Sequence, residues 1–268
     1  MGTEKRQRQK QGHQLQREEL RKWEKRQANR RRLFRYGGIA VVALAVLFGY
    51  SQLTDDGGDE QATTATTTPP ASTTALPAPT PCPPADGVDT PVRAFSEPPP
   101  TCIDPATSYT AVFDTSEGEI RVALDTENTP DTVNNFVVLA RYGYYDDTPV
   151  FRTDPSIGIV QAGGQDATSS PGYTIPDEGD GYTYEAGQIV MARTAEPDSA
   201  SAQFFLVAND AASVLDSQGT YVVFGDTDAA GLEVVRTILG LHEDQPDNPL
   251  GGAPNPPVTI NSVTIEES

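Results

Sequence analysis

Hydrophobic and polar residues alternate with a period of two through much of the second half of the chain, which predicts β-strands. Residues 109–124 ("YTAVFDTSEGEIRVAL") read as two short strands joined at "TSEG", a hairpin. Four further strand patterns follow: "QIVMAR" (188–193), "QFFLV" (203–207), "YVVFG" (221–225) and "VTINSVTI" (258–265). The stretch 154–187 consists mostly of Gly, Pro, Ser and Asp, and we expect it to be rich in loops.

Two other segments repeat apolar residues with the helical period of 3.6. In residues 129–143, Thr129 suits an N-cap, Pro130 suits the first helical position, and Gly143 can end the helix. A second helix is expected within 231–241 ("GLEVVRTILGL"). Many short strands with two isolated helices favour a mainly β fold, a closed antiparallel barrel whose ends the helices cover. Strands and helices do not alternate, which argues against a parallel α/β sheet.

The strand pattern at 203–207 places a polar amide and a large aromatic ring on one face. Alternate residues of a strand point to opposite faces, so Gln203 and Phe205 lie together. Phe204 and Leu206 point to the other face, which suits a hydrophobic core. The mixed face is compatible with a strand buried on both sides or with one that a partner crosses, and the pattern alone does not decide between them.

The charge of the chain is divided unevenly along its length. The formal net charge is −19 over 268 residues. Residues 1–35 hold 13 of the 19 Lys and Arg but only four of the 38 Asp and Glu, a net charge of +9, so the remaining residues carry −28. Such an acidic region repels nucleic acid and anionic surfaces, and we expect it to bind neither.

An apolar segment follows the basic N-terminal region. Residues 36–54 ("YGGIAVVALAVLFGYSQLT") are 19 residues without a charge, about the length that spans a bilayer. The basic run "RRRLFR" precedes them and "DDGGDE" follows, which predicts a cytoplasmic N-terminus and an extracytoplasmic C-terminal domain. We expect a single-pass membrane anchor rather than a cleaved signal peptide, because no small-x-small cleavage site follows. Residues 1–35 either lie as a helix on anionic lipid or only set the topology.

Residues 55–81 are rich in Thr, Ala and Pro and are expected to form a disordered linker. The two cysteines of the chain, Cys82 and Cys102, begin and end a Pro-rich stretch, so we treat 82–108 as a separate loop region before the domain at 109–268. An isolated pair of cysteines outside the cell most often forms one disulfide. A zinc site is not expected, because the chain holds only two histidines.

Five segments between residues 129 and 225 form a specific combination. In order, they are "TPDTVNNFVVLARYGYYDD", "VFRTDPSIGIVQAGG", "GYTIPDEG", "GQIVMARTAEPDSASAQFFLV" and "TYVVFG". This combination resembles the cyclophilin-type peptidyl-prolyl isomerases. The resemblance implies an eight-stranded barrel capped by two helices, with a groove on the outer wall that binds X-Pro peptides and needs no cofactor or metal. It also implies that the mixed face of 203–207 is the binding face.

The resemblance implies a role for each matching residue. Arg152 matches the family's catalytic arginine, Gln161 and Gln203 would hold the peptide backbone, and Phe205 would form the floor of the proline pocket. The substrate-binding positions implied in this way are Phe151, Ile159, Gln161, Ala192, Arg193, Thr194, Gln203, Phe205, Leu215 and Tyr221.

These residue types suit the rotation of an X-Pro amide. Rotation loses amide resonance, with a barrier of roughly 18–20 kcal/mol, and takes tens to hundreds of seconds unaided, on the order of a slow folding step. Nothing covalent is required. A positively charged donor such as Arg152 can bond the prolyl nitrogen as it becomes pyramidal, while apolar walls hold the ring.

Several positions depart from the family pattern. The usual F-H-R reads Val150-Phe151-Arg152, and an insertion before "VQAGG" leaves the pocket phenylalanine with only Ile157 or Gly158 as a match. Arg193 replaces an asparagine that binds the substrate backbone. These changes are expected to lower activity or shift substrate preference.

Two further positions differ at the rim of the implied pocket. Tyr221 stands where the family often has histidine, and it still offers a hydroxyl. Val214 stands where many members have a tryptophan that contacts the bound cyclic undecapeptide cyclosporin, so we expect this chain to bind cyclosporin weakly.

Two functions follow from these observations. The first is an active, membrane-tethered and monomeric prolyl isomerase that assists the folding of exported or cell-envelope proteins by acting on X-Pro polypeptides. The second is a proline-peptide binding module or holdase that has lost most catalysis. The first requires Arg152 to lie over the pocket, whereas the second tolerates its displacement.

Overall fold

The computed structural model describes residues 75–76, 78–245 and 250–268, which belong to one compact unit that begins at Pro69. The basic segment 1–35, the expected membrane span 36–54 and the first part of the linker lie outside the described residues. None of the helices within the described ranges is both long enough and apolar enough to cross a bilayer.

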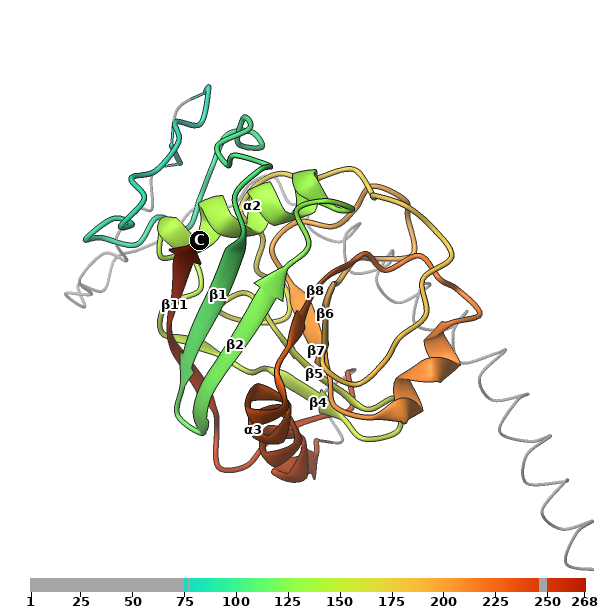
Figure 1. The fold of residues 1–268 in the computed structure, drawn as a ribbon. Coiled ribbons are helices and arrows are strands. Elements are labelled where there is room, and N and C mark those ends of the chain that lie inside the picture. Colours follow the sequence, from blue (N-terminus) through green and yellow to red (C-terminus); the bar gives the residue numbers. More distant parts are fainter. Residues whose placement is uncertain (1–74, 77, 246–249) are drawn as a thin grey trace, which may run out of the picture. The chain divides into compact units, whose positions relative to one another are not determined.

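The described residues form a single antiparallel sheet that curls on itself (Figure 1). Its order is β3-β11-β1-β2-β8-β6-β7-β5-β4-β10-β9. The strands are β1 Tyr109–Thr115, β2 Gly118–Leu124, β3 Thr148–Pro149, β4 Arg152–Asp154, β5 Ile159–Ala162, β6 Gln188–Met191, β7 Phe204–Val207, β8 Val223–Thr227, β9 His242–Asp244, β10 Gly252–Pro254 and β11 Thr259–Glu267. The hairpin expected at 109–124 is β1–β2, and the fold is mainly β as the sequence predicts.

The sheet returns on itself through one short stretch of chain. β3 pairs with β11 at one end of the strand order, whereas β4 pairs with β5 near the other end. Only Val150 and Phe151 separate β3 from β4, and the amide of Val150 donates to the carbonyl of Val258 at 2.9 Å. The stretch 148–154 therefore joins the two ends of the curled sheet.

The sheet has eleven strands in the described residues, not the eight expected. Two of the additional strands, β9 (His-Glu-Asp) and β10 (Gly-Ala-Pro), pair with each other, and neither is long enough to show an alternating pattern. The third arises because the stretch 148–154 is divided into β3 and β4 at Val150. β5, at 159–162, lies inside the region that we expected to be mostly loops. We missed this strand because all four of its residues are buried, so the sequence shows no alternation of apolar and polar residues.

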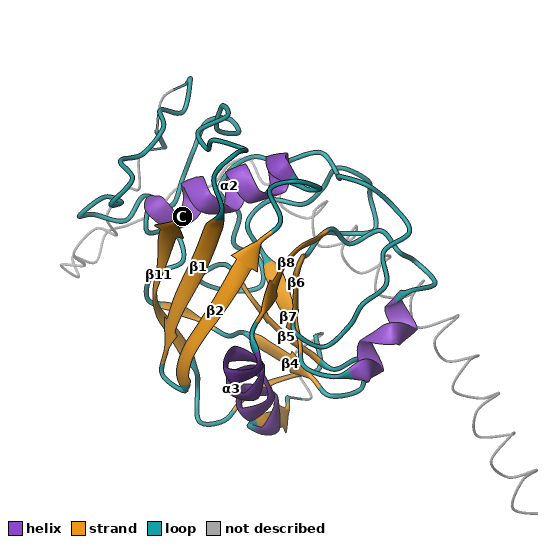
Figure 2. Cartoon of the chain, in the orientation of Figure 1, coloured by secondary structure: helices purple, strands orange, loops and turns teal. Residues whose placement is uncertain are grey.

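Two α-helices cover the ends of the sheet. Figures 1 and 2 show α2 (Pro130–Arg141) across one end and α3 (Ala229–Gly240) at the other. Both begin and end close to the expected positions. α2 is not capped by the side chain of Thr129; instead the carboxylate of Glu178 accepts from the amides of Asp131 and Thr132 at 3.0 and 2.6 Å. A loop distant in sequence therefore satisfies the first turn of α2.

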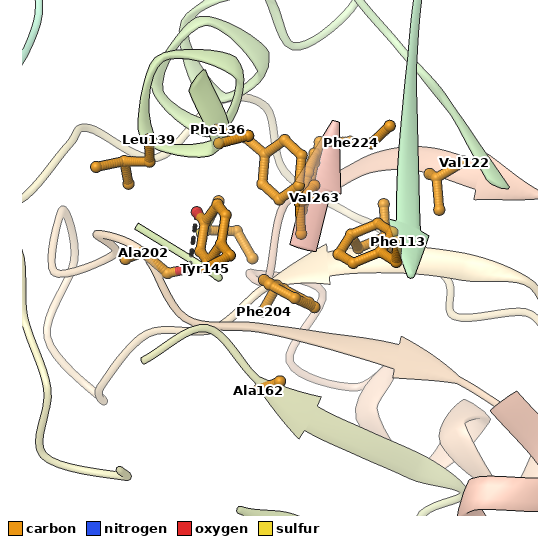
Figure 3. Packing of buried hydrophobic residues seen from close by; sticks show 14 of the residues in the cluster. Phe113, Val122, Phe136, Leu139, Tyr145, Ala162, Ala202, Phe204, Phe224 and Val263 are labelled. Atoms are coloured by element: carbon orange, nitrogen blue, oxygen red, sulfur yellow. Dashed lines mark hydrogen bonds between the residues drawn. The ribbon is translucent and has the colours of Figure 1, made fainter. Parts of the chain in front are cut away.

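Aromatic rings fill the space between α2 and the inner face of the sheet (Figure 3). Phe136 of α2 lies between Tyr145 and Phe204, with ring centroids 5.1 and 5.9 Å away, and Phe113 of β1 closes the cluster. The hydroxyl of Tyr145 donates to the carbonyl of Ala202 at 3.2 Å, the dashed line in Figure 3. This rigid core fixes the strands whose outer faces are described below.

The disulfide-bonded segment packs on α2 and on the residues that follow it. Cys82 and Cys102 form the expected disulfide, with Cα atoms 5.5 Å apart. Between them, Phe95 is 3% exposed, and its ring contacts those of Tyr142 and Tyr173 at centroid distances of 5.3 and 6.1 Å. The segment is therefore a packed part of the unit rather than a free loop.

The packed region begins before the expected boundary at residue 82. The amide of Leu76 donates to the carbonyl of Ala94 at 3.0 Å, and the hydroxyl of buried Thr80 donates to the carbonyl of Glu97 at 2.9 Å. Residues 75–76 and 78–81, which we assigned to the disordered linker, are thus ordered. Backbone and hydroxyl hydrogen bonds hold them, and composition does not reveal such contacts.

Candidate active site

The outer face of β5, β6 and β7 carries an apolar cluster separate from the core. Its buried members are Ile159, Tyr184, Val190, Phe205, Val207 and Ala212. Phe204 and Leu206 belong to the core instead, so the alternation expected for 203–207 is confirmed. Phe205 lies opposite Gln161 of β5 and Val190 of β6 in the strand register. The mixed face of the strand is therefore the outer one.

A cavity of about 190 Å³ lies over this cluster. Its lining residues are Arg152, Ile157, Ile159, Gln161, Ala192, Arg193, Phe205, Leu215, Tyr221 and Leu250. Eight of the eleven residues singled out from the sequence are among them, so positions up to 69 residues apart in the chain come together. The ring of Phe205 meets the ring of Tyr221 edge-on, with centroids 5.8 Å apart.

Arg152, the first residue of β4, is held by three partners. Its Nε donates to the carbonyl of Leu250 at 3.1 Å, its Nη1 to Oε1 of Gln161 at 3.0 Å, and its Nη2 to Oδ2 of Asp154 at 2.9 Å. A guanidinium has five N–H donors, so one hydrogen on each of Nη1 and Nη2 is left over from these three bonds. The group is 80% buried and borders the cavity.

The two glutamines continue this line of hydrogen bonds along the groove. Nε2 of Gln161 donates to Oε1 of Gln203 at 3.2 Å. Nε2 of Gln203 donates in turn to the carbonyls of Ala167 and Ser169, at 3.0 and 3.2 Å. Gln203 is not part of the cavity lining, but the hydrogen bond places it beside Gln161 at its edge. Each amide orientation is therefore determined by its neighbour.

Asp154 is fixed through both carboxylate oxygens. While Oδ2 pairs with Arg152, Oδ1 accepts from the amide and the hydroxyl of Ser156, at 3.0 and 2.6 Å. Burial alone would raise the pKa of Asp154, but the hydrogen bonds from Ser156 and Arg152 outweigh burial and hold that pKa below its ordinary value. Asp154 is thus a carboxylate at neutral pH.

Arg193 forms a wall of the cavity and its charge is already paired. Its guanidinium lies 5.9 Å from the ring centroid of Tyr221 and 3.6 Å from the carboxylate of Asp177. Its Nε and Nη1 donate to the carbonyls of Thr220 and Glu196 at 3.1 and 2.7 Å. Arg193 was expected at a substrate-binding position in place of an asparagine; it lines the cavity, and its hydrogen bonds join the loops beside it.

Besides Gln203, two of the residues expected at the site do not line the cavity, and neither does Val214, which was expected at its rim. Phe151 lies between β3 and β4 and does not line the cavity. Thr194 is exposed, and its hydroxyl bonds Ser199 at 2.8 Å within its own loop. Val214 is 58% exposed on the short 3₁₀ helix Asp210–Leu215. Its neighbour Leu215 reaches the cavity, whereas Val214 faces solvent.

The structure adds three residues that sequence reasoning did not assign to the site. Leu250 supplies a carbonyl to Arg152 and an apolar wall, but it lies in a loop without a pattern. The hydroxyl of Tyr184 both accepts from the amide and donates to the carbonyl of Tyr221, at 2.9 and 3.1 Å, which fixes that wall. Asp154 could have been found from the sequence, because it is two residues after Arg152 and alternate residues of a strand share a face. Ile157, one of two candidates to replace the pocket phenylalanine, lines the cavity.

The arrangement suits the binding of an apolar ring and rotation about an amide bond next to that ring. The floor is apolar, one oriented guanidinium borders it, and amides follow along one side. Within the part of the chain that the structure describes, no three His, Cys, Asp or Glu side chains are grouped to hold a metal ion. The fold and the site together define a curled β-sheet protein with a small cavity on the outer face of the sheet.

Comparison with known proteins identifies the family. Residues 110–265 match the family described as "Cyclophilin type peptidyl-prolyl cis-trans isomerase/CLD". The chain is 36% identical over 168 residues to "Peptidyl-prolyl cis-trans isomerase A" of Dickeya dadantii, covering 59% of this chain and 85% of that protein. It is 35% identical over 162 residues to "Peptidyl-prolyl cis-trans isomerase cyp18" of Streptomyces antibioticus, covering 53% and 93%.

A solved structure supports the fold. The crystal structure of a cyclophilin type isomerase from Cryptosporidium parvum superimposes with a TM-score of 0.51 at 23% identity, over 60% of this chain and 99% of that one. The chain therefore belongs to the cyclophilin-type peptidyl-prolyl isomerase family, and it is a peptidyl-prolyl cis–trans isomerase.

Proposed function

We propose that Arg152 is the catalytic residue of this isomerase and that the groove beside it binds X-Pro segments of exported or cell-envelope proteins. The observation that carries the proposal is the position of the guanidinium, which borders an apolar cavity floored by Phe205 and keeps one N–H on each Nη for a ligand. The prolyl ring would occupy the cavity, with Ile159, Leu215 and Ala192 as further walls.

To accelerate rotation, the enzyme needs a group whose interaction with the substrate is stronger in the transition state than in the ground state. As the X-Pro amide twists, its nitrogen becomes pyramidal and accepts a hydrogen bond, and Arg152 is a charged donor that borders the apolar floor. Gln161 and Gln203 would hold the peptide backbone on the acyl side, because their hydrogen bonds orient the amides along the groove. Shortening the reaction to milliseconds requires roughly 5–7 kcal/mol of transition-state stabilisation.

The location is part of the same proposal. Residues 36–54 would anchor the chain in the cell membrane with the basic N-terminus in the cytoplasm and residues 55–268 outside. The Cys82–Cys102 disulfide supports an oxidising compartment, because such bonds persist outside the cytosol. The strongly acidic domain would work as a monomer, since copies of net charge −28 beyond residue 35 repel each other.

Two measurements test the proposal. Exchange NMR on a short X-Pro peptide should show cis–trans exchange accelerated by catalytic amounts of the full chain in detergent. Binding without acceleration would instead support the proline-peptide binding module. Protease added to intact cells should remove the domain that carries the disulfide, and protection of that domain would contradict the proposed topology.

A further inference from the structure

One partner of Arg152, the carboxylate of Asp154, is itself held by the backbone of the turn after β4. Arg152 and Asp154 are alternate residues of β4 and lie on the same face, so their side chains meet without a turn of the chain. Asp154 does not line the cavity, whereas Arg152 does. The carboxylate therefore contacts the guanidinium outside the cavity lining.

The carboxylate connects Arg152 to the turn after β4. Its Oδ1 is held by the amide and hydroxyl of Ser156, and the amide of Ile157 bonds the carbonyl of Asp154 at 3.3 Å to close the turn. Both oxygens of one rigid carboxylate are therefore occupied, one by the turn and one by Nη2 of Arg152. The side chains of the ion pair are 20% and 22% exposed, so water competes weakly for it.

An arginine side chain has several rotatable bonds and loses much entropy when it is held in one pose. Catalysis by a single donor requires that pose, because a displacement of about 1 Å can cost 100-fold in rate. Gln161 and the carbonyl of Leu250 are neutral acceptors, and each meets a single nitrogen of the guanidinium. The carboxylate of Asp154 is the charged partner that fixes the plane of the guanidinium.

We propose that Asp154 is a positioning residue for the isomerisation reaction, which holds Arg152 in its catalytic pose through a contact outside the cavity lining. The inference rests on the proposed role of Arg152. It makes Asp154 part of the catalytic machinery although it does not touch the substrate. The remaining charged group of the cavity, Arg193, is paired with Asp177 and does not compete for the carboxylate.

The test compares five variants of the full chain in detergent with the parent. Asp154→Asn keeps the shape, but its amide presents an acceptor to only one of the two donor groups that the carboxylate binds. Ser156→Ala leaves the carboxylate and removes the hydroxyl that holds it, at an exposed position where folding is not at stake. Asp104→Asn is the matched control, because Asp104 also accepts from an amide two residues on, that of Ala106, but binds no arginine in the structure. The fourth variant is Arg152→Ala, and the fifth combines it with Asp154→Asn.

We expect kcat to fall about 10-fold in Asp154→Asn and about 3-fold in Ser156→Ala, with peptide affinity within 2-fold of the parent and no change in Asp104→Asn. The Asp154→Asn change should have no further effect in the Arg152→Ala background. In ¹⁵N NMR spectra, the Nη signals of Arg152 should be separate in the parent and merge in Asp154→Asn, because the group rotates when released. A purely structural role would lower the melting temperature without these changes.

The possible outcomes separate the two proposals. If Arg152→Ala isomerises as fast as the parent, the proposed function fails, and the inference fails with it. If Arg152→Ala is slow but Asp154→Asn and Ser156→Ala turn over like the parent, only the positioning role is overturned. A loss of activity in Asp154→Asn that is equally large in the Arg152→Ala background also overturns it, since the effect would then not pass through the arginine.

Discussion

Gln161 lies directly opposite Arg152 in the ladder between β4 and β5, and its Oε1 accepts from Nη1 of the arginine at 3.0 Å. Paired positions of neighbouring strands keep their separation as long as the sheet is intact. The amide that would hold the peptide and the guanidinium that would act on it are therefore set at a fixed distance by backbone pairing. This relationship connects the curled sheet to the chemistry of the groove.

Replacing the guanidinium should remove catalysis and leave binding. We expect Arg152→Ala to lower turnover by about 10- to 1000-fold, or roughly 1.4–4 kcal/mol, because the donor acts mainly in the transition state. Lysine at this position should restore little, since it lacks the planar fork that meets Gln161 and Asp154 together. Exchange NMR for the rate and a titration for peptide affinity separate the two effects.

Arg121→Ala is the control for that experiment, because Arg121 pairs with Glu266 on the surface of β2 and β11, outside the cavity. It should isomerise like the parent. Equal rates for Arg152→Ala and Arg121→Ala would exclude Arg152 as the catalyst.

Phe205 and Phe204 provide a matched pair on opposite faces of β7. Phe205→Ala should weaken peptide binding, because it opens the floor of the cavity, and should cost about 3 kcal/mol of stability or more. Phe204→Leu removes part of a ring from the inner core, so it should lower the free energy of unfolding while peptide affinity stays the same. Calorimetric titration and urea unfolding check both. Equal loss of affinity in the two variants would mean that the floor is not specifically involved.

Removal of the disulfide should destabilise the unit without affecting the reaction. Cys82 and Cys102 are 20 residues apart, and opening a loop of that size costs about 3 kcal/mol in the chain-entropy account. The double Cys→Ser variant should unfold at lower urea concentration and isomerise at the parent rate. Mass spectrometry of the unreduced parent should find one intramolecular link, and two free thiols would contradict the pairing.

A larger side chain in place of Val214 should strengthen the binding of cyclosporin. The residue is 58% exposed and adjoins Leu215 at the cavity, so an indole there has room to cover a bound ligand. Val214→Trp should tighten cyclosporin binding by roughly 10-fold, by adding apolar contact and an N–H donor. Ala229→Trp, at the exposed start of α3 and away from the cavity lining, should not. Unchanged affinity in both would show that position 214 does not reach the ligand.

Buried tyrosines should make the fold sensitive to alkali. Burial raises the pKa of Tyr144 and of Tyr184 to about 12, against about 10 in an unfolded chain. The folded state therefore holds its phenolic protons where the unfolded state releases them. Stability should be constant below about pH 10 and fall as pH rises towards the folded pKa values.

The free energy of unfolding in urea between pH 8 and pH 11.5, roughly the range around these pKa values, measures the effect. Tyr184→Phe should reduce the slope, because one of the shifted groups is then absent. A stability that stays level to the upper end of that range would contradict the role of burial.

Much of the architecture was predictable because local patterns determine it. The hairpin at 109–124 and both helices follow from their apolar periods, and the opposite directions of Phe204 and Phe205 follow from alternation. The pair β9–β10 was missed because each strand has only three residues and neither alternates. The number of strands was wrong for the same reason, together with the division of one strand at Val150.

Site residues could be predicted only where a motif or the alternation of strand faces points to them. The motifs indicated Arg152 and Gln161, and the cavity brings them together. The carbonyl of Leu250, 98 residues from Arg152, has no signal in the sequence. The same holds for Arg193, whose partners Asp177 and Thr220 come from two different loops. Such pairings depend on how loops pack, which periodicity does not encode.

The disulfide also determines how the unit carries mechanical load. A pull applied to the chain before residue 82 passes from Cys82 through the sulfur bridge to Cys102 and on to Tyr109 at the start of β1. The hydrogen bonds of Leu76 and Thr80 to the backbone of Ala94 and Glu97 are loaded before the bridge, and the rest of residues 83–101 is bypassed. β1 lies between β11 and β2, and five strands separate it from β4 in the sheet order. Under the proposed tether, a pull from the N-terminal side would therefore load these contacts and then β1, not β4, which carries Arg152.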